Sequence, residues 1–273
     1  MPVHGGFLHH FAGAAQLLFP VFFNPLHYSA AQVPTGIIHQ TDFDTYTNDW
    51  LEVVSTKADE LEKCFRLAGA GENIHCVYFS ALQIAQLVST VGAQNIRGRF
   101  LIIRDDADYP HFALALFATD DLNGRLSAYY VSHNYWELAG ESPAGLNVFA
   151  PVLLPDALAS YWQQNWSPEG EDPVATPAMF NSTYGYLRGY TFALDDFLKP
   201  LAYIPAGTSM QQAAPIRINF GLHTYYPATS NGEALRSTFG LMVSYVCPPK
   251  PGADDIEDTE VFYDLANPCP PKC

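Results

Sequence analysis

The stretch Ile96-Arg97-Gly98-Arg99-Phe100 returns 120 residues later as Ile216-Arg217-Ile218-Asn219-Phe220, and this recurrence decides the expected fold. Each copy opens an apolar run rich in β-branched and aromatic residues, which is typical of a strand. Each run is followed by a turn and by a second apolar run, as in an antiparallel meander. We therefore expect the chain to contain one structural unit twice.

Three further landmarks recur in the same order and support this prediction. They are Trp50 and Trp166, Phe79 and Phe192, and Phe112 and Phe239, with offsets of 116, 113 and 127 residues. The offsets drift only by lengths typical of loops, as expected for a duplicated unit. The alternative is that helices and strands of similar type merely follow one another. Duplication predicts that residues 43–131 superpose on residues 156–265.

In the first unit, apolar residues from Phe43 to Phe65 follow the spacing of a helix. A second helix begins after Ser80, which can form a capping box with Gln83. Phe79 and Ile84 can form a hydrophobic staple at the same helix end. The expected strands are residues 96–104, 112–119 and 126–131.

In the second unit we expect helices near residues 156–166 and 194–201. Pro200 should kink or end the later helix, because proline lacks the N–H that a helix interior needs. The expected strands are residues 215–222, 237–246 and 260–265.

Helices followed by strands form the α+β pattern. We predict an α+β protein made of two tandem, internally repeated helix-helix-antiparallel-meander units, with one shared sheet as a further option. The expected divisions are an apolar N-terminal arm at 1–40, units at 41–139 and 156–265, a connector at 140–155 and a Cys/Pro tail at 266–273.

Composition excludes two classes of protein. Of the 273 residues, 48% are hydrophobic, so the chain as a whole is not intrinsically disordered. The formal net charge is −15, and such a field would repel nucleic acid. We therefore expect no nucleic-acid partner.

The N-terminal arm is apolar and uncharged over residues 7–23. No Lys or Arg precedes Lys57, so the arm does not read as a signal peptide, and Pro20 interrupts any membrane span. The arm could pack on its own domain, on a second subunit or partner protein, or on a membrane, which is the less favoured choice. We expect a cytoplasmic protein that associates with itself or with a protein partner through this arm.

Five cysteines in a chain of this length do not form a disulfide framework. Cys64 and Cys76 are expected to be small buried hydrophobic residues. The remaining cysteines, Cys247, Cys269 and Cys273, could be free, bridged or bound to zinc, although the spacing suits zinc poorly. We expect no metal and no cofactor.

The candidate binding residues are cationic and acidic side chains, since the sequence has no nucleophile elbow or phosphate loop. Arg97 and Arg217 occupy equivalent places in the two units. Each could pair with a carboxylate, or both could converge on an anion. The other candidates lie on the turn between two strands and just after it: Asp105, Asp106, Asp108 and His111.

The strand at 216–221 and the chain end at 267–273 resemble a group of uncharacterised bacterial proteins. That group shows an Ile-Arg-aliphatic-aromatic strand followed by Gly, and a closing Cys-Pro-Pro-x-Cys motif. The first unit departs from the pattern, because Leu101 stands where the Gly would be. The resemblance implies no activity and transfers no catalytic residue.

These observations favour a non-catalytic assembly or partner-binding protein on a duplicated α+β scaffold. The alternative is a small-molecule-binding or hydrolytic enzyme with its site at the junction of the two units. An ion-binding module is a third option. A pocket holding arginines and carboxylates would favour the second or third reading, and an exposed apolar patch would favour the first.

Overall fold

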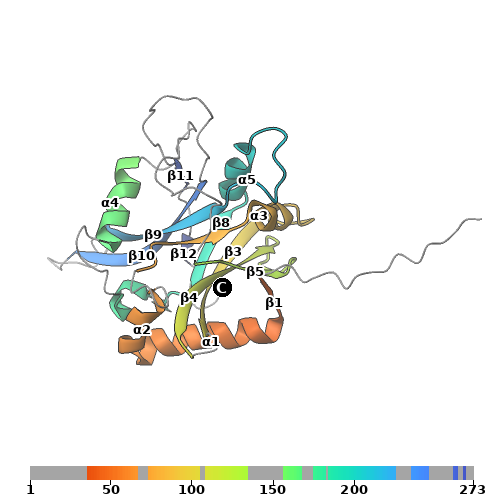
Figure 1. Cartoon of the computed structure of the whole chain (residues 1–273). Coiled ribbons are helices and arrows are strands. Elements are labelled where there is room, and N and C mark those ends of the chain that lie inside the picture. The colour runs from red at the N-terminus through yellow and green to blue at the C-terminus, as the bar shows by residue number, and fades with distance from the viewer. Residues whose placement is uncertain are drawn as a thin grey trace, which may run out of the picture. The chain divides into compact units, whose positions relative to one another are not determined.

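The computed structural model describes residues 36–66, 73–104, 108–134, 156–167, 175–182, 184–225, 235–245, 261–263 and 267–268 (Figure 1). All of them belong to one unit that begins at Pro34, so the two predicted units are not separate bodies. The predicted connector at 140–155 lies outside the described residues.

The described helices are short, and none has the length and apolarity that crossing a bilayer requires. They are α1 (Gln40–Thr56), α2 (Ala58–Cys64), α3 (Ala81–Val88), α4 (Asp156–Trp166) and α5 (Asp195–Ala202), with a 3-10 helix η1 (Pro177–Phe180). The capping box predicted at the start of α3 is confirmed, since Ser80 Oγ accepts from Gln83 N and the Gln83 side chain accepts from Ser80 N. Pro200 lies inside α5, which continues for two more residues and ends at Ala202.

The described strands form two main sheets and one small ribbon, and every pairing is antiparallel. The first sheet has the order β1-β5-β4-β3-β8-β12, and the second has the order β11-β10-β9-β2. The first-sheet strands in chain order are β1 (Ile37–Ile38), β3 (Asn95–Arg104), β4 (Pro110–Thr119), β5 (Tyr129–Val131), β8 (Gly189–Ala193) and β12 (Asn267–Pro268). The second-sheet strands are β2 (Cys76–Phe79), β9 (Ile216–Tyr225), β10 (Arg236–Tyr245) and β11 (Val261–Tyr263), and the ribbon is β6 (Asn181–Ser182) with β7 (Gly185–Tyr186).

The protein is therefore α+β with antiparallel sheets, as predicted, but the two halves exchange a strand. β2, from the first half, pairs with β9 in the second sheet, and β8, from the second half, pairs with β3 in the first sheet. The sequence prediction missed both exchanged strands. The option of one shared sheet is not what the structure contains, because the main strands form two sheets.

The pairing of the exchanged strands is the same on both sides. Phe79 lies opposite Ile216, and Phe192 lies opposite Ile96. The strand that follows also keeps its register, since Ala118 lies opposite Ile96 and Tyr245 lies opposite Ile216. Equivalent residues of these pairs are 113, 120 and 127 positions apart for the exchanged strand, the strand that begins with the repeated motif and the strand that follows it. These are three of the offsets seen in the sequence.

Hydrogen bonds between the halves repeat in the same way. Trp50 Nε1 donates to Leu187 O at 2.8 Å, and Trp166 Nε1 donates to Ile74 O at 3.4 Å. Two backbone bonds of the same kind are Phe100 N to Arg188 O at 3.0 Å and Phe220 N to His75 O at 2.9 Å. Each half is thus closed by groups from the other half.

The core lies between the inner faces of the two sheets. Phe112 of the first sheet meets Phe220 of the second with ring centroids 5.4 Å apart, and Phe100 meets Phe239 at 5.7 Å. Side chains alternate along a strand, so the residues next to these phenylalanines in the sequence lie on the outer faces of the sheets.

Helices cover part of each outer face. On the first sheet, Phe43 of α1 stacks on Tyr129 with centroids 3.8 Å apart. On the second sheet, Trp162 of α4 stacks on His223 at 3.8 Å, and Figure 1 shows α4 beside β9.

Two boundaries differ from the sequence prediction. Ile37 and Ile38 lie within the predicted arm at 1–40, yet they form β1 and pair with Tyr130 and Tyr129. Asn267 lies within the predicted tail at 266–273, yet it forms β12 and pairs with Thr191. Strands of two residues carry too little periodicity to be recognised in a sequence.

Candidate functional site

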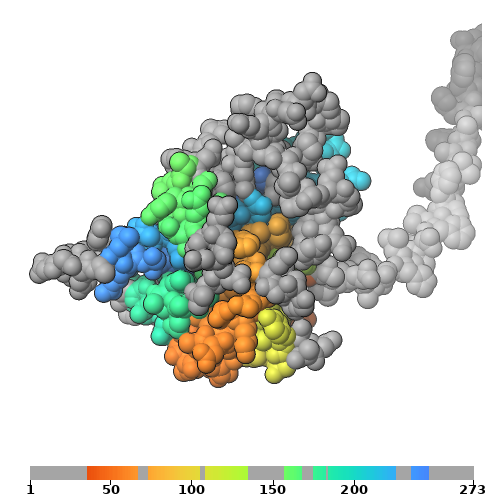
Figure 2. All heavy atoms as spheres, turned by 60° about the vertical axis from the view of Figure 1, so that its left-hand side comes forward, coloured from red at the N-terminus to blue at the C-terminus, as the bar shows by residue number. Residues whose placement is uncertain are grey.

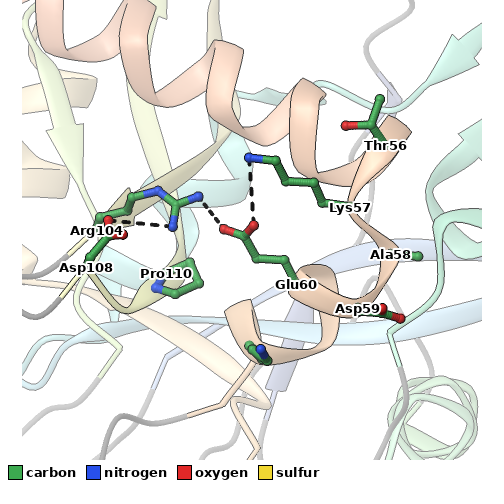
Figure 3. Close-up of a pocket in the computed structure, with 9 residues that line it drawn as sticks. Thr56, Lys57, Ala58, Asp59, Glu60, Arg104, Asp108 and Pro110 are labelled. Atoms are coloured by element: carbon green, nitrogen blue, oxygen red, sulfur yellow. Dashed lines mark hydrogen bonds and ion pairs between the residues drawn. The ribbon is translucent and has the colours of Figure 1, made fainter.

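A hollow of about 630 Å³ lies between the α1–α2 junction and the end of the β3–β4 hairpin (Figure 3). Figure 2 shows the orange surface of α1 and α2 beside the yellow surface of that hairpin. The lining residues are Thr56, Lys57, Ala58, Asp59, Glu60, Lys63, Arg104, Asp108 and Pro110.

Lys57 sits at the corner of this hollow because α1 ends and α2 begins there. Its backbone (φ −127°, ψ 61°) is not helical, and its N–H donates to Val53 O at 3.0 Å, which closes the last turn of α1. The corner aims the Lys57 ammonium and the Glu60 carboxylate at each other, with Nζ and Oε2 3.8 Å apart.

Glu60 is the centre of a chain of ion pairs. Its carboxylate bonds to the guanidinium of Arg104, and Arg104 Nη1 also lies 3.8 Å from Asp108 Oδ1. Lys57 Nζ lies 2.9 Å from Glu52 Oε1, and this hydrogen bond lowers the pKa of Glu52 and raises that of Lys57. The side chains are partly or fully exposed, so solvent screens each pair and its contribution to stability is small.

This hollow can hold a polar group, but its residues do not suit nucleophilic attack. The hydroxyl in the lining, that of Thr56, donates to Glu52 O at 2.7 Å. Cations and carboxylates alternate and neutralise one another, so the network fastens the α1–α2 corner to the hairpin.

The structure brings one predicted turn residue to this hollow. Asp108 lines it, with a left-handed backbone of φ 59°. His111 lies on β4 opposite Ile103 and is not part of the lining. Asp105 and Asp106 lie outside the described residues.

Sequence reasoning missed Lys57, Glu60 and Arg104. Arg104 stands directly before the predicted acidic turn, and that position was the available signal.

Arg97 and Arg217 are not brought together, so the predicted convergence on one anion is wrong. Arg97 lies on the outer face of the first sheet, next to Ile96 of the core, and Arg217 lies on the outer face of the second. Arg217 hydrogen-bonds to Tyr78, its partner on β2. Arg97 is 6% exposed and lies opposite Thr191.

The described thiols and the half-buried His223 imidazole are not activated groups. Burial raises the pKa of the Cys64 thiol to about 12 and raises that of Cys76 as well. Burial lowers the pKa of His223 to about 4. Both cysteines are free, and no described group of His, Cys, Asp and Glu is arranged to hold a metal ion.

The tail cysteines, Cys247, Cys269 and Cys273, lie outside the described residues. Whether they are free, bridged or bound to zinc therefore stays a prediction.

Comparisons with protein-family models, with curated proteins and with solved structures found no match. The resemblance of the 216–221 strand and the chain end to a bacterial group stays a prediction.

Proposed function

We propose that this protein is a non-catalytic assembly protein that binds a second copy of itself through apolar surface. The observation that carries the proposal is a pair of neighbouring turns with exposed apolar side chains. Val91 is 94% exposed, Leu122 is 83% exposed and Leu126 is 41% exposed. Large apolar side chains gathered in this way mark interaction surfaces on soluble proteins.

The two turns are held together by the end of the first sheet. Gln94 N donates to Thr119 O at 2.8 Å, and the Cβ position of Gly92 lies 3.6 Å from Leu126 Cδ1. The Asp120 carboxylate accepts from Leu122 N at 3.0 Å, which fixes the second turn. The patch therefore lies on turns that are already ordered. Little conformational entropy is lost in these turns when a partner binds.

A second copy is the favoured occupant because the chain carries matching chemistry. Residues 7–23 of the arm contain five phenylalanines and no formal charge, in a chain with a net charge of −15. An apolar segment avoids the mutual repulsion that two acidic surfaces would otherwise meet.

The duplicated scaffold is part of this proposal. Equal registers in both exchanged strands, and equivalent bonds from Trp50 and Trp166, support an internal duplication with pseudo-twofold symmetry. Such a scaffold presents related surfaces twice, which suits assembly.

A cytoplasmic location is also part of the proposal. It is supported by the free thiols of Cys64 and Cys76, since cytosolic proteins keep their thiols reduced.

The competing candidate is a small-molecule site in the hollow at Arg104. Its volume of about 630 Å³ falls within the range of ligand pockets, and it holds an arginine beside carboxylates. A binder or hydrolase of this kind would lose ligand affinity in an Arg104→Gln variant while its mass in solution stayed unchanged.

Light scattering after size exclusion tests the proposal. We expect the full chain to be an oligomer, and both deletion of residues 1–33 and the double variant Val91→Ser with Leu122→Ser to give a folded species of lower mass. The deletion stops at 33 because Ile37 and Ile38 belong to the first sheet. Leu235→Ser, which also removes a half-exposed leucine, is the control. A monomeric full chain at every concentration would overturn the proposal.

A further inference from the structure

The outer face of the second sheet carries two glycines that lie directly opposite each other, Gly221 of β9 and Gly240 of β10. Neither residue has a side chain, so the space above this pair is open to larger neighbouring side chains. Three of them meet there: His223 of β9, Met242 of β10 and Trp162 of α4.

The ends of the His223 and Met242 side chains lie over the two glycines. His223 Nε2 is the atom nearest to the Cβ position of Gly240, and Met242 Cε lies 2.9 Å from the Cβ position of Gly221. Opposite Cβ positions of an antiparallel strand pair are roughly 5 Å apart. The methionine sulfur, one bond from Cε, is therefore brought close to the imidazole nitrogen.

Trp162 covers the same pair of glycines from the side of α4, the helix that Figure 1 shows beside β9. Its ring stacks on the His223 imidazole with centroids 3.8 Å apart and an angle of 25° between the ring planes. Its Cβ lies 3.0 Å from the Cβ position of Gly221. An aromatic face placed in this way attracts a cation bound beside it.

The imidazole carries an unsatisfied atom at this place. His223 Nε2 is buried, and no described residue gives it a hydrogen-bond partner. An unsatisfied buried polar atom is destabilising, so its position among possible metal ligands points to a bound ion. Met242 is fully buried, and its thioether is a soft, polarizable donor.

We propose that His223 Nε2 and Met242 Sδ bind a soft monovalent metal ion, Cu(I), beside the ring of Trp162. Thioether ligands select Cu(I), and imidazole is also a good copper ligand. Zinc would need more ligands than this pair, and calcium and magnesium need oxygen ligands. The ion would satisfy Nε2, and the indole would stabilise its charge. The sequence analysis expected no metal, because one imidazole and one thioether form no recognisable motif.

Nuclear magnetic resonance of the methionine methyl groups tests the proposal on the full chain, which has four methionines. Protein labelled with carbon-13 at these groups is titrated with silver nitrate, because Ag(I) is a soft monovalent ion that resists oxidation. The five cysteines also bind Ag(I), so the titration extends beyond five equivalents. We expect the Met242 signal to shift until it saturates, while the signal of Met179 on η1 stays in place.

Two further ions examine the selectivity of the site. Cu(I), added without oxygen, should shift the Met242 signal as Ag(I) does, whereas zinc nitrate should leave it unchanged. A Met242 signal that stays in place after the thiols are saturated with Ag(I) would overturn the proposal. A shift caused by zinc would likewise contradict a soft-ion site.

His223→Gln should raise the Ag(I) concentration at the midpoint of the Met242 shift by about tenfold or more. The control is His39→Gln, at an exposed histidine before α1, which should leave the midpoint unchanged. An unchanged midpoint in His223→Gln would mean that the imidazole is not a ligand.

Met242→Leu keeps the test decisive should His223→Gln fail to fold, because it conserves side-chain volume. It also assigns the Met242 signal. The imidazole signals of His223 should shift with Ag(I) in the parent and stay in place in this variant, and equal shifts in both would contradict the proposal. These readouts do not depend on the mass of the assembly.

Discussion

Trp50 and Trp166, the buried tryptophans of the described part of the chain, each donate a hydrogen bond to the half of the molecule to which they do not belong. Trp50 is 1% exposed and donates to a carbonyl of the second half, and Trp166 is 2% exposed and donates to a carbonyl of the first. Their rings also pack on the phenylalanines between the sheets, for example Trp50 on Phe100 with centroids 5.1 Å apart. Each of these two tryptophans therefore contributes both a hydrogen bond and ring packing to the core.

Trp50→Phe should lower the free energy of unfolding by about 1–3 kcal/mol, because Leu187 O loses its donor and the smaller ring leaves a void. Trp162→Phe is the control, since Trp162 is only half-buried and stacks on one face of His223. Urea unfolding checks both values. Equal losses in the two variants would contradict the role of the Trp50 hydrogen bond.

His223 makes stability depend on pH, because burial lowers its pKa to about 4 in the folded protein. Its usual value is about 6.5. The unfolded chain therefore binds a proton more readily below pH 6.5, and stability is lost as the pH falls from 6.5 through 4.

The expected contribution of His223 between these pH values is about 1–3 kcal/mol. His223→Gln should remove this part of the acid sensitivity, so the parent and the variant should differ in the slope of unfolding free energy against pH. Urea unfolding at pH 7.0 and 4.5 measures it. Parallel pH profiles would show that the imidazole does not titrate as described.

At the scale of elements, the two exchanged strands, β2 and β8, connect the two halves of the fold. β8 is held on β3 by five residue pairs, from Asn95 with Ala193 to Arg99 with Gly189. The pairing ends at Gly189, where the chain leaves the strand by a turn that other residues cannot make. The β3–β8 pairing therefore ends at a position that only glycine fits.

Gly189→Ala should cost about 3 kcal/mol or more, since a Cβ at this position would collide with Gly98 O. Gly207→Ala is the matched control, because Gly207 also has a positive φ, +89°, but no atom lies within 4 Å of its Cβ position. That control should lose only about 1 kcal/mol. Thermal unfolding of both variants, followed by circular dichroism, ranks them, and an equal loss would contradict the close approach.

At the scale of the whole molecule, neither half supplies every strand of its sheet. The first sheet contains β8 from the second half, and the second sheet contains β2 from the first. The aromatic core is likewise shared, because its rings come from both halves. Folding should therefore be a single cooperative event.

Residues 34–139 and 140–273, expressed separately, should each lack cooperative unfolding, and the two fragments mixed should regain it. Circular dichroism during thermal unfolding measures this, with the intact chain from residue 34 as the control. A fragment that unfolds cooperatively by itself would show that strand exchange is not needed for folding.

The sequence alone predicted the long elements, because their signals are local. The capping box at Ser80, the helix at 156–166 and the paired runs beginning at Ile96 and Ile216 all follow from residue spacing within one element. The recurrence of Phe79 as Phe192 predicted equivalent positions before the structure placed them opposite Ile216 and Ile96.

Only the tertiary structure decided which half completes which sheet, because strand pairing is a contact between residues far apart in the chain. It also separated Arg97 from Arg217, which spacing had suggested as one site, and stacked Trp162 on His223. The tertiary structure also placed the α1–α2 corner at Lys57 beside Arg104, because these residues are far apart in the chain. Periodicity reveals which side of a strand a residue occupies, whereas the packing of distant segments determines what that side faces.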